Sequence, residues 1–156
     1  MSLREVTAHT VRAVTDLRVS ALQQSYVASN AVSIAQAYFH PEAWFRAIYV
    51  DDAPVGFAML EDPTLLIDWI GHAQVGLWRF MIDERHQGRG HGRAALRLLI
   101  EHVRTRPGQT KLRTSCVPGP HSPIAFYERC GFRRTGELDD AEEVLELSLQ
   151  ATPSRR

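Results

Sequence analysis

The chain has 156 residues, enough for one domain with its own hydrophobic core, and we expect that domain over residues 1–150 with a disordered tail at 151–156. Lysine plus arginine and aspartate plus glutamate number 18 each, so the chain as a whole carries no field that would attract a nucleic acid. No apolar run reaches the length of a membrane span and no signal-peptide segment opens the chain, so we expect a cytoplasmic protein without a membrane partner.

The first half of the chain alternates between strand-like and helix-like patterns. Val11, Val14, Leu17 and Val19 recur at helical spacing, and Ser29 or Asn30 can cap a second helix. In chain order we expect a strand at 3–8, helices at 10–22 and 29–39, a short helical turn at 41–44, and strands at 47–50 and 55–60 joined by a hairpin turn at Asp51 and Asp52.

The second half has a central strand followed by an amphipathic helix. Residues 75–83 are apolar on both faces apart from Arg79, which is typical of a buried strand. Leu96, Leu99 and Val103 repeat at helical spacing before Gly108. After a loop at 63–74, we therefore expect strands at 75–83, 111–117, 132–137 and 144–149, with helices at 93–104 and 123–129, an α/β order.

The two cysteines give no sign of a metal site or a disulfide framework. Cys116 and Cys130 form no C-x-x-C pair, and their spacing matches no zinc motif. We expect both to be reduced and partly buried, and we expect no metal cofactor.

Between Arg85 and Arg93 the chain reads R-H-Q-G-R-G-H-G-R, and it stands between the buried strand and the amphipathic helix. Glycines there let backbone N–H groups approach an anion, and the helix that follows adds the positive end of its dipole. The glycine spacing is neither the G-x-G-x-x-G of a dinucleotide site nor a P-loop ending in G-K-[ST]. The pattern predicts a site for a pyrophosphate of another kind.

Two motifs carry a resemblance to a known family. Gln87, Gly90 and Gly92 match Q-x-x-G-x-G, and residues 126–132 read F-Y-E-R-C-G-F. With the order of elements, they make the chain resemble the GNAT acetyltransferase superfamily over nearly its whole length. Within that superfamily it looks most like bacterial diamine and polyamine (spermine/spermidine) acetyltransferases, through stretches at 26–30 with 33–37, at 78–83 and at 117–123.

The resemblance implies a mixed, mostly antiparallel sheet of about seven strands, flanked by helices and splayed between the fourth and fifth strands. It also implies acetyl-CoA as co-substrate. The residues expected to bind coenzyme A are Phe80, Met81 and Ile82 along its pantetheine arm, and Gln87, Gly88, Arg89, Gly90, His91, Gly92 and Arg93 around its pyrophosphate. Ser122 either caps the helix at 123–129, which we favour, or gives its hydroxyl to the arm.

Acetyl transfer from a thioester requires a neutral amine, donors for the developing oxyanion, and a proton for the leaving thiolate. In register with the family motif, Tyr127 is the expected general acid. Glu84 and Asp68 are our candidates for a general base, with ordered water as the alternative. Tyr26, Tyr38 and Trp44 are candidate aromatic walls for the acceptor, because residues 20–26 contain no acid to hold a polycation.

We therefore expect an N-acetyltransferase that acts on a primary amine of a small molecule, with diamines and polyamines among the candidates. An aminoglycoside-like drug or a peptide α-amine is the alternative acceptor, and a non-catalytic acyl-CoA-binding module of the same fold is the alternative function. By analogy with such enzymes, a homodimer through strands within residues 132–149 is a further expectation. A nucleic-acid partner is disfavoured by the zero net charge.

Overall fold

The structure is a computed structural model that describes residues 1–150, so the tail expected at 151–156 lies outside the described residues. Within them, seven strands form one sheet in the order β1-β2-β3-β4-β5-β7-β6. The strands are β1 (Ser2–Arg4), β2 (Ala43–Val50), β3 (Ala53–Glu61), β4 (Gly76–Ile82), β5 (Lys111–Cys116), β6 (Arg133–Asp139) and β7 (Glu142–Ser148). The helices are α1 (Val11–Thr15), α2 (Asn30–Ala37), α3 (His91–Arg104) and α4 (Ile124–Arg129), with short 3-10 turns η1 (Pro63–Leu65) and η2 (Glu84–His86).

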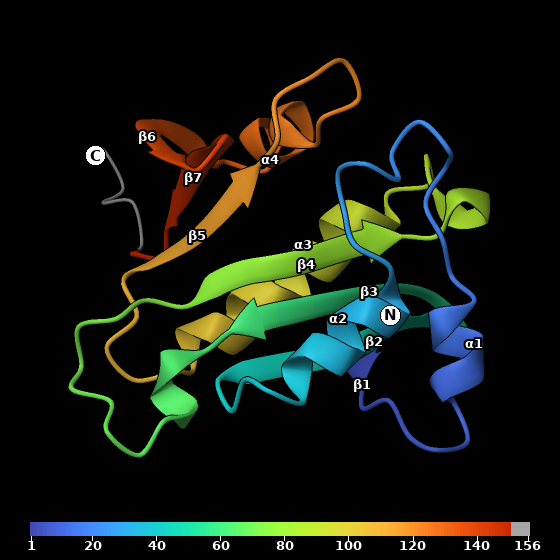
Figure 1. The fold of residues 1–156 in the computed structure, drawn as a ribbon, viewed down its shortest axis with the longest axis horizontal. Coiled ribbons are helices and arrows are strands. Elements are labelled where there is room, and N and C mark those ends of the chain that lie inside the picture. The colour runs from blue at the N-terminus through green and yellow to red at the C-terminus, as the bar shows by residue number, and fades with distance from the viewer. Residues whose placement is uncertain (151–156) are drawn as a thin grey trace, which may run out of the picture.

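Neighbouring strands are antiparallel except for β4 and β5, which are parallel. Two hydrophobic clusters cover opposite faces of this sheet, and Figure 1 shows the helices on its two sides. Leu96 and Leu99 of α3 pack in one cluster with Ile124 of α4, whereas Val14 of α1 packs in the other cluster with Ile34 of α2. The predicted mixed, mostly antiparallel sheet flanked by helices is confirmed.

Local signals explain why the helices begin where they do. The Ser29 hydroxyl accepts a hydrogen bond from the Val32 backbone N–H at 3.2 Å, so Ser29 is the cap of α2. Asn30, the alternative cap, is instead buried, and its side-chain amide donates to the Val14 carbonyl at 2.9 Å. The contact ties α1 to α2. It places both helices over the same face of the sheet.

Two predicted helical segments are wrong. The helix expected at 10–22 ends at Thr15, because the chain beyond it crosses to the end of β4. There the Arg18 N–H donates to the Asp83 carboxylate at 3.0 Å, and the Glu84 N–H donates to the Arg18 carbonyl at 2.9 Å. These long-range bonds replace the hydrogen bonds that a longer helix would make.

The helical turn expected at 41–44 is the start of β2, where Ala43 pairs with Glu61 and Trp44 pairs with Leu60. The first strand is also shorter than expected and ends at Arg4. In both places the pairing available from a neighbouring strand decides the conformation, which local propensity cannot anticipate.

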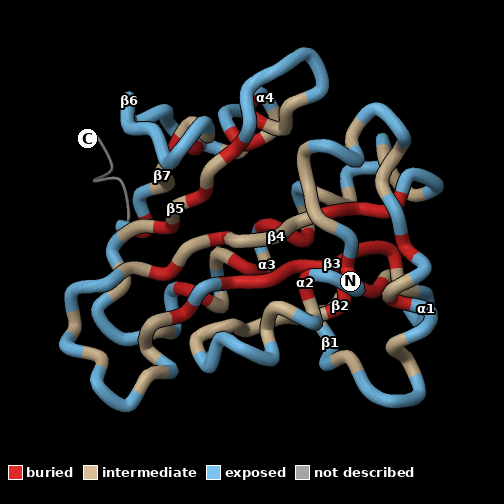
Figure 2. Tube along the Cα trace, viewed as in Figure 1, coloured by how far each residue is buried: buried red, intermediate tan, exposed pale blue. Residues whose placement is uncertain are grey.

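Burial follows the centre of the sheet. Figure 2 shows β3 buried along most of its length and β4 buried in part, whereas β6 is exposed along its length. In the part of the chain that is described, no helix combines the length and the apolar character needed to cross a membrane.

Candidate active site

A cleft of about 1550 Å³ separates β4 from β5. It begins where the two strands stop pairing: Gly76 pairs with Arg113, Leu77 pairs with Thr114, and the strands diverge beyond that point. The walls are formed by β4 and β5, the segment between α1 and α2, the glycine loop before α3, the N-terminal part of α4, and the β6–β7 hairpin. The predicted splay between the fourth and fifth strands is confirmed.

A β-bulge accounts for the divergence. On β3, Leu60 pairs with Leu77 and the adjacent Met59 pairs with Arg79, so Trp78 is an extra residue on β4. A bulge bends its strand and increases the local twist, which turns β4 away from β5. From Trp78 to Ile82, the edge of β4 that faces β5 therefore has no strand partner.

The glycine loop lies at one end of the cleft, before α3. Gly88 and Gly90 have positive φ angles of 74° and 81°, and Gly90 is the residue that precedes the first turn of the helix. Among the described atoms, nothing lies within 4 Å of a Cβ built at either glycine, so the space beside them is open. At Gly92, in contrast, a Cβ would approach the Phe126 ring at 3.3 Å, because α3 packs closely on α4 there.

The 14-residue α3 begins beside this open space, so its first backbone N–H groups and the positive end of its dipole face that space. The predicted loop residues His91, Gly92 and Arg93 line the cleft, whereas Arg89 is exposed and lies outside its lining. The Arg93 guanidinium donates to the Arg129 carbonyl at 3.0 Å, which leaves its remaining N–H groups near the loop. Open space, free N–H groups and an arginine side chain together make a cradle of the kind that binds phosphate groups in other proteins.

Gln87 has a structural role in this conformation. Its amide nitrogen donates to the Ile82 carbonyl and to the Gln23 side-chain oxygen, both at 2.9 Å. These bonds fasten the end of β4 to the segment between α1 and α2. The glutamine of the loop motif thus positions the walls of the cleft.

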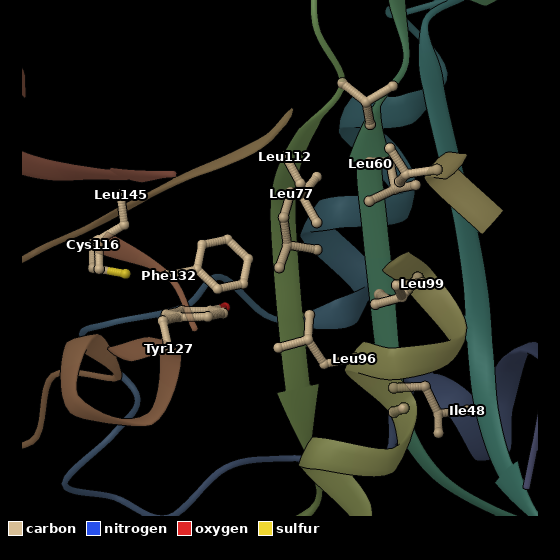
Figure 3. Packing of buried hydrophobic residues seen from close by; sticks show 14 of the residues in the cluster. Ile48, Leu60, Leu77, Leu96, Leu99, Leu112, Cys116, Tyr127, Phe132 and Leu145 are labelled. Atoms are coloured by element: carbon tan, nitrogen blue, oxygen red, sulfur yellow. The ribbon is translucent and has the colours of Figure 1, made fainter. Parts of the chain in front are cut away.

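Tyr127 of α4 lies at the vertex of the cleft. It is 5% exposed, and Figure 3 shows its hydroxyl oxygen pointing toward β4, where Leu77 lies. The Thr114 hydroxyl donates to the Leu77 carbonyl at 3.1 Å at the last β4–β5 pair. Burial and the neighbouring Cys116 raise the pKa of Tyr127 above its ordinary value, although a hydrogen bond with Thr114 opposes this. The phenol is therefore a protonated donor at neutral pH.

Ser122 and Cys116 are two further polar groups of the cleft lining. The cap that we favoured for Ser122 is wrong: the residue that precedes α4 is Pro123, and the buried Ser122 hydroxyl has no hydrogen-bond partner within residues 1–150. Burial, with the charges of Glu142 and Glu143, raises the pKa of Cys116 to about 12. Cys116 is thus a thiol at neutral pH and a poor nucleophile.

Of the three aromatic residues expected to line the acceptor site, Tyr26 lines the cleft. The Tyr26 hydroxyl accepts a hydrogen bond from the His121 N–H at 3.4 Å across the cleft. Tyr38 is 86% exposed at the end of α2. Trp44 stacks on His102 of α3, with ring centroids 4.1 Å apart. The structure therefore places Tyr38 and Trp44 outside the cleft.

The two candidate bases also lie outside the cleft lining. Glu84 is exposed in η2, and Asp68 is exposed in the loop after η1. Glu61 at the end of β3 does line the cleft, and so do four acids of the β6–β7 hairpin that sequence reasoning missed: Glu137, Asp139, Asp140 and Glu142. The cluster D-D-A-E-E at 139–143 was a visible signal, but the sequence did not show that β7 pairs with β5 beside the cleft. Nowhere in residues 1–150 do three His, Cys, Asp or Glu side chains gather in a way that could hold a metal ion.

The fold and this cleft define an acyltransferase of the GNAT class, and the chain belongs to the Acetyltransferase (GNAT) family, whose model matches residues 12–132. It is similar to the spermine/spermidine N(1)-acetyltransferase of Bacillus subtilis (strain 168), with 33% identity over 150 residues that cover 93% of this chain and 96% of the relative. A probable spermine N(1)-acetyltransferase of Bacillus subtilis subsp. natto is 31% identical with the same coverage.

Solved structures share the fold. The PaiA N-acetyltransferase of Thermoplasma acidophilum, solved with coenzyme A, has a TM-score of 0.68 at 13% identity and covers 94% of this chain and 98% of its own. AAC(6′)-Ib, solved with paromomycin and acetyl-CoA, has a TM-score of 0.73 at 18% identity and covers 94% of this chain and 92% of its own.

Proposed function

We propose that this acyltransferase moves the acetyl group of acetyl-CoA to a primary amine of a small diamine or polyamine. The observation that carries the proposal is the position of Tyr127, a buried phenol at the vertex of a cleft that contains the glycine cradle. Acetyl-CoA, when bound, supplies an acetyl group activated as a thioester. The protein supplies the positioning, the electrostatics and a proton.

The residues of the cleft fit coenzyme A. Open space beside Gly88 and Gly90 and the N-terminus of α3 suit a pyrophosphate, and the flanking Arg93 adds positive charge. The unpaired edge of β4 offers backbone groups to an extended amide chain, as a neighbouring strand would. The Ser122 hydroxyl, buried in the lining without a partner, gives that chain one more hydrogen-bonding group.

Three features of the chain serve the reaction. A backbone N–H on the free edge of β4 donates to the carbonyl oxygen as negative charge develops there. Tyr127 holds a proton for the departing sulfur, because its raised pKa keeps the phenol protonated at neutral pH. Direct attack by the amine is favoured over a covalent acyl-cysteine, because Cys116 remains a thiol.

The acceptor assignment depends on charge and on kinship. The acids Glu61, Asp139, Asp140 and Glu142 line the cleft, and ammonium groups are their natural partners. The Bacillus relatives that match almost the whole chain are spermine or spermidine acetyltransferases by name. Both observations favour a polyamine. Because Glu84 and Asp68 lie outside the cleft, we assign removal of the amine proton to water.

An amine panel tests the function. Free thiol release from acetyl-CoA is measured with spermidine, spermine, putrescine and an aminoglycoside, and we expect turnover to be greatest with the polyamines. If acetyl-CoA binds but no amine causes thiol release, the proposed acetyl transfer is refuted and the non-catalytic acyl-CoA-binding module is favoured. Faster turnover with the aminoglycoside would refute the polyamine assignment alone.

Tyr127→Phe tests the proton donor. We expect kcat to fall about 100-fold, with the KM for acetyl-CoA nearly unchanged, because the substitution removes the proton and retains the ring. Tyr38→Phe makes the same chemical change at an exposed residue outside the cleft and serves as the control. If both variants turn over like the parent protein, Tyr127 is not the acid.

A further inference from the structure

Arg79 is a half-buried guanidinium on the α2 side of the cleft. Its Nη2 donates to the Gln36 side-chain oxygen of α2 and its Nη1 donates to the Trp78 carbonyl, both at 3.1 Å. Its Nε is buried and has no hydrogen-bond partner among the described residues. The group is thus held in place by uncharged acceptors. Because neither bond is made to a carboxylate, the positive charge of Arg79 can act on groups in the cleft.

The bulge on β4 explains this orientation. With Trp78 inserted as an extra residue, Trp78 and Arg79 both face α2, and the guanidinium lies 5.3 Å from the centre of the Trp78 ring. Leu77 and Phe80, which flank these two residues, pack in the hydrophobic cluster that α3 and α4 form on the other face of the sheet. Tyr127 belongs to the same cluster. Tyr127 and the glycine cradle therefore lie on the face of the diverging strands that α3 and α4 cover. Arg79 lies on the opposite face, toward α2, where space remains for the acceptor.

The charged groups near Arg79 lie on β5, β6 and β7, and none is contributed by its α2 neighbour. Burial lowers the pKa of Arg79, while Glu142 of β7 raises it, and an arginine stays charged throughout the working pH range. The Glu142 carboxylate accepts a hydrogen bond from the Ser115 hydroxyl of β5 and offsets part of the Arg79 charge. Arg113 of β5, which also lines the cleft, forms ion pairs with Glu137 and Glu146. The α2 neighbour, Gln36, carries no charge.

We propose that Arg79 keeps the attacking amine in its neutral form by placing a fixed positive charge beside it. The inference rests on the function proposed above and explains how water can take the amine proton without a carboxylate base. A free alkylamine with a pKa near 10 is about 0.1% neutral at pH 7. A like charge a few ångströms away disfavours the ammonium form, and a shift of one pKa unit raises the neutral fraction about tenfold.

The same charge arrangement orients a diamine. The ammonium at its far end is drawn to Asp139 and Asp140 on the hairpin, and its near end meets Arg79. The ammonium proton at the near end is released to water. The nitrogen–carbon bond then forms as the carbon–sulfur bond breaks, the nitrogen loses a second proton, and sulfur gains one from Tyr127. The second nitrogen proton replaces the one that Tyr127 gave.

The pH dependence of kcat tests the inference, because kcat reports groups in the enzyme–substrate complex. Arg79→Gln removes the charge and keeps a side-chain amide. We expect its acid limb to move up by about one pH unit, kcat at pH 7 to fall about tenfold and to recover above pH 9, and the KM for the amine to fall. Arg79→Lys keeps the charge and should leave the limb in place. Arg97→Gln, at an exposed residue of α3, controls for the loss of a charge elsewhere.

If the role of Arg79 were merely structural, Arg79→Gln would raise the KM for the amine and lower kcat, and each change would be the same at every pH. That result, or superimposable profiles of the parent protein and Arg79→Gln, overturns the inference while the proposed function stands. A direct measurement uses ¹⁵N-labelled putrescine in the complex with coenzyme A. We expect one nitrogen to titrate below its free value in the parent protein and near that value in Arg79→Gln. If putrescine, spermidine and spermine all fail to bind, the inference and the polyamine assignment both fall.

Discussion

Replacing Asp83 by Asn should destabilise the protein by an amount that depends on pH. Asp83 is fully buried where β4 ends, and its carboxylate accepts hydrogen bonds from the Arg18 N–H at 3.0 Å and the Arg85 N–H at 3.0 Å. The Arg85 side chain adds two further bonds, at 2.8 Å and 3.2 Å. Burial alone would raise the pKa of Asp83, but these hydrogen bonds and the Arg85 charge lower it from 3.8 to about 2.

The lowered pKa gives the size and the sign of the effect. Because the folded protein binds the proton more weakly than the unfolded chain, the charged carboxylate stabilises the fold above pH 3.8, and the stabilisation is lost as the pH falls toward 2. The difference between 3.8 and about 2 corresponds to about 2 kcal/mol at pH 7, and it decreases to about 1 kcal/mol at pH 3. A smaller contribution that does not depend on pH is also expected, because the amide N–H₂ of asparagine can face backbone donors.

Urea unfolding of the parent protein and of Asp83→Asn at several pH values from 7 to 3 measures this difference. Glu84→Gln, at the exposed neighbouring residue, is the control and should unfold like the parent protein at each pH. A difference in the free energy of unfolding that is the same at pH 7 and pH 3 would refute the reasoning. So would a difference below about 0.5 kcal/mol at pH 7, since a surface ion pair contributes that little.

Two further substitutions test the walls of the cleft. Gly119→Ala should raise the KM for the amine several-fold and leave acetyl-CoA binding unchanged, because a Cβ at Gly119 would clash with the Tyr26 hydroxyl and displace it. Unchanged steady-state kinetics would contradict this. Ser122→Ala should raise the KM for acetyl-CoA and leave the free energy of unfolding unchanged or about 1 kcal/mol higher, because the buried hydroxyl has no partner within residues 1–150. A clear loss of stability in urea would show that Ser122 has a structural role instead.

The sequence predicted the elements whose signals are local. The turn between β2 and β3 was readable from Asp51 and Asp52, and Asp51 has the positive φ of 51° that such turns favour. The end of α4 was readable from Gly131, which has a φ of 98°. In these places neighbouring residues determine the backbone, so a short stretch of sequence is sufficient.

The features that shape the acceptor half of the cleft depend on contacts between distant segments. Leu17 packs in the same cluster as Val14, but it does so from beyond the end of α1, so helical spacing alone predicted a helix that is too long. Nothing in the residues of β4 marks Trp78 as the bulge, which is defined by the pairing with β3. The hairpin acids reach the cleft because β7 lies between β5 and β6, an order that no local pattern predicts.

The two residue pairs that join β4 to β5 also have a mechanical consequence. The sheet consists of two plates, β1 to β4 and β5 to β7, which share one short edge at Gly76 and Leu77. A small rotation about that edge would widen or narrow the cleft without breaking a hydrogen bond inside either plate. A ligand that forms hydrogen bonds with both parts of the sheet would fix the angle between them. We therefore expect a bound ligand to make the molecule stiffer.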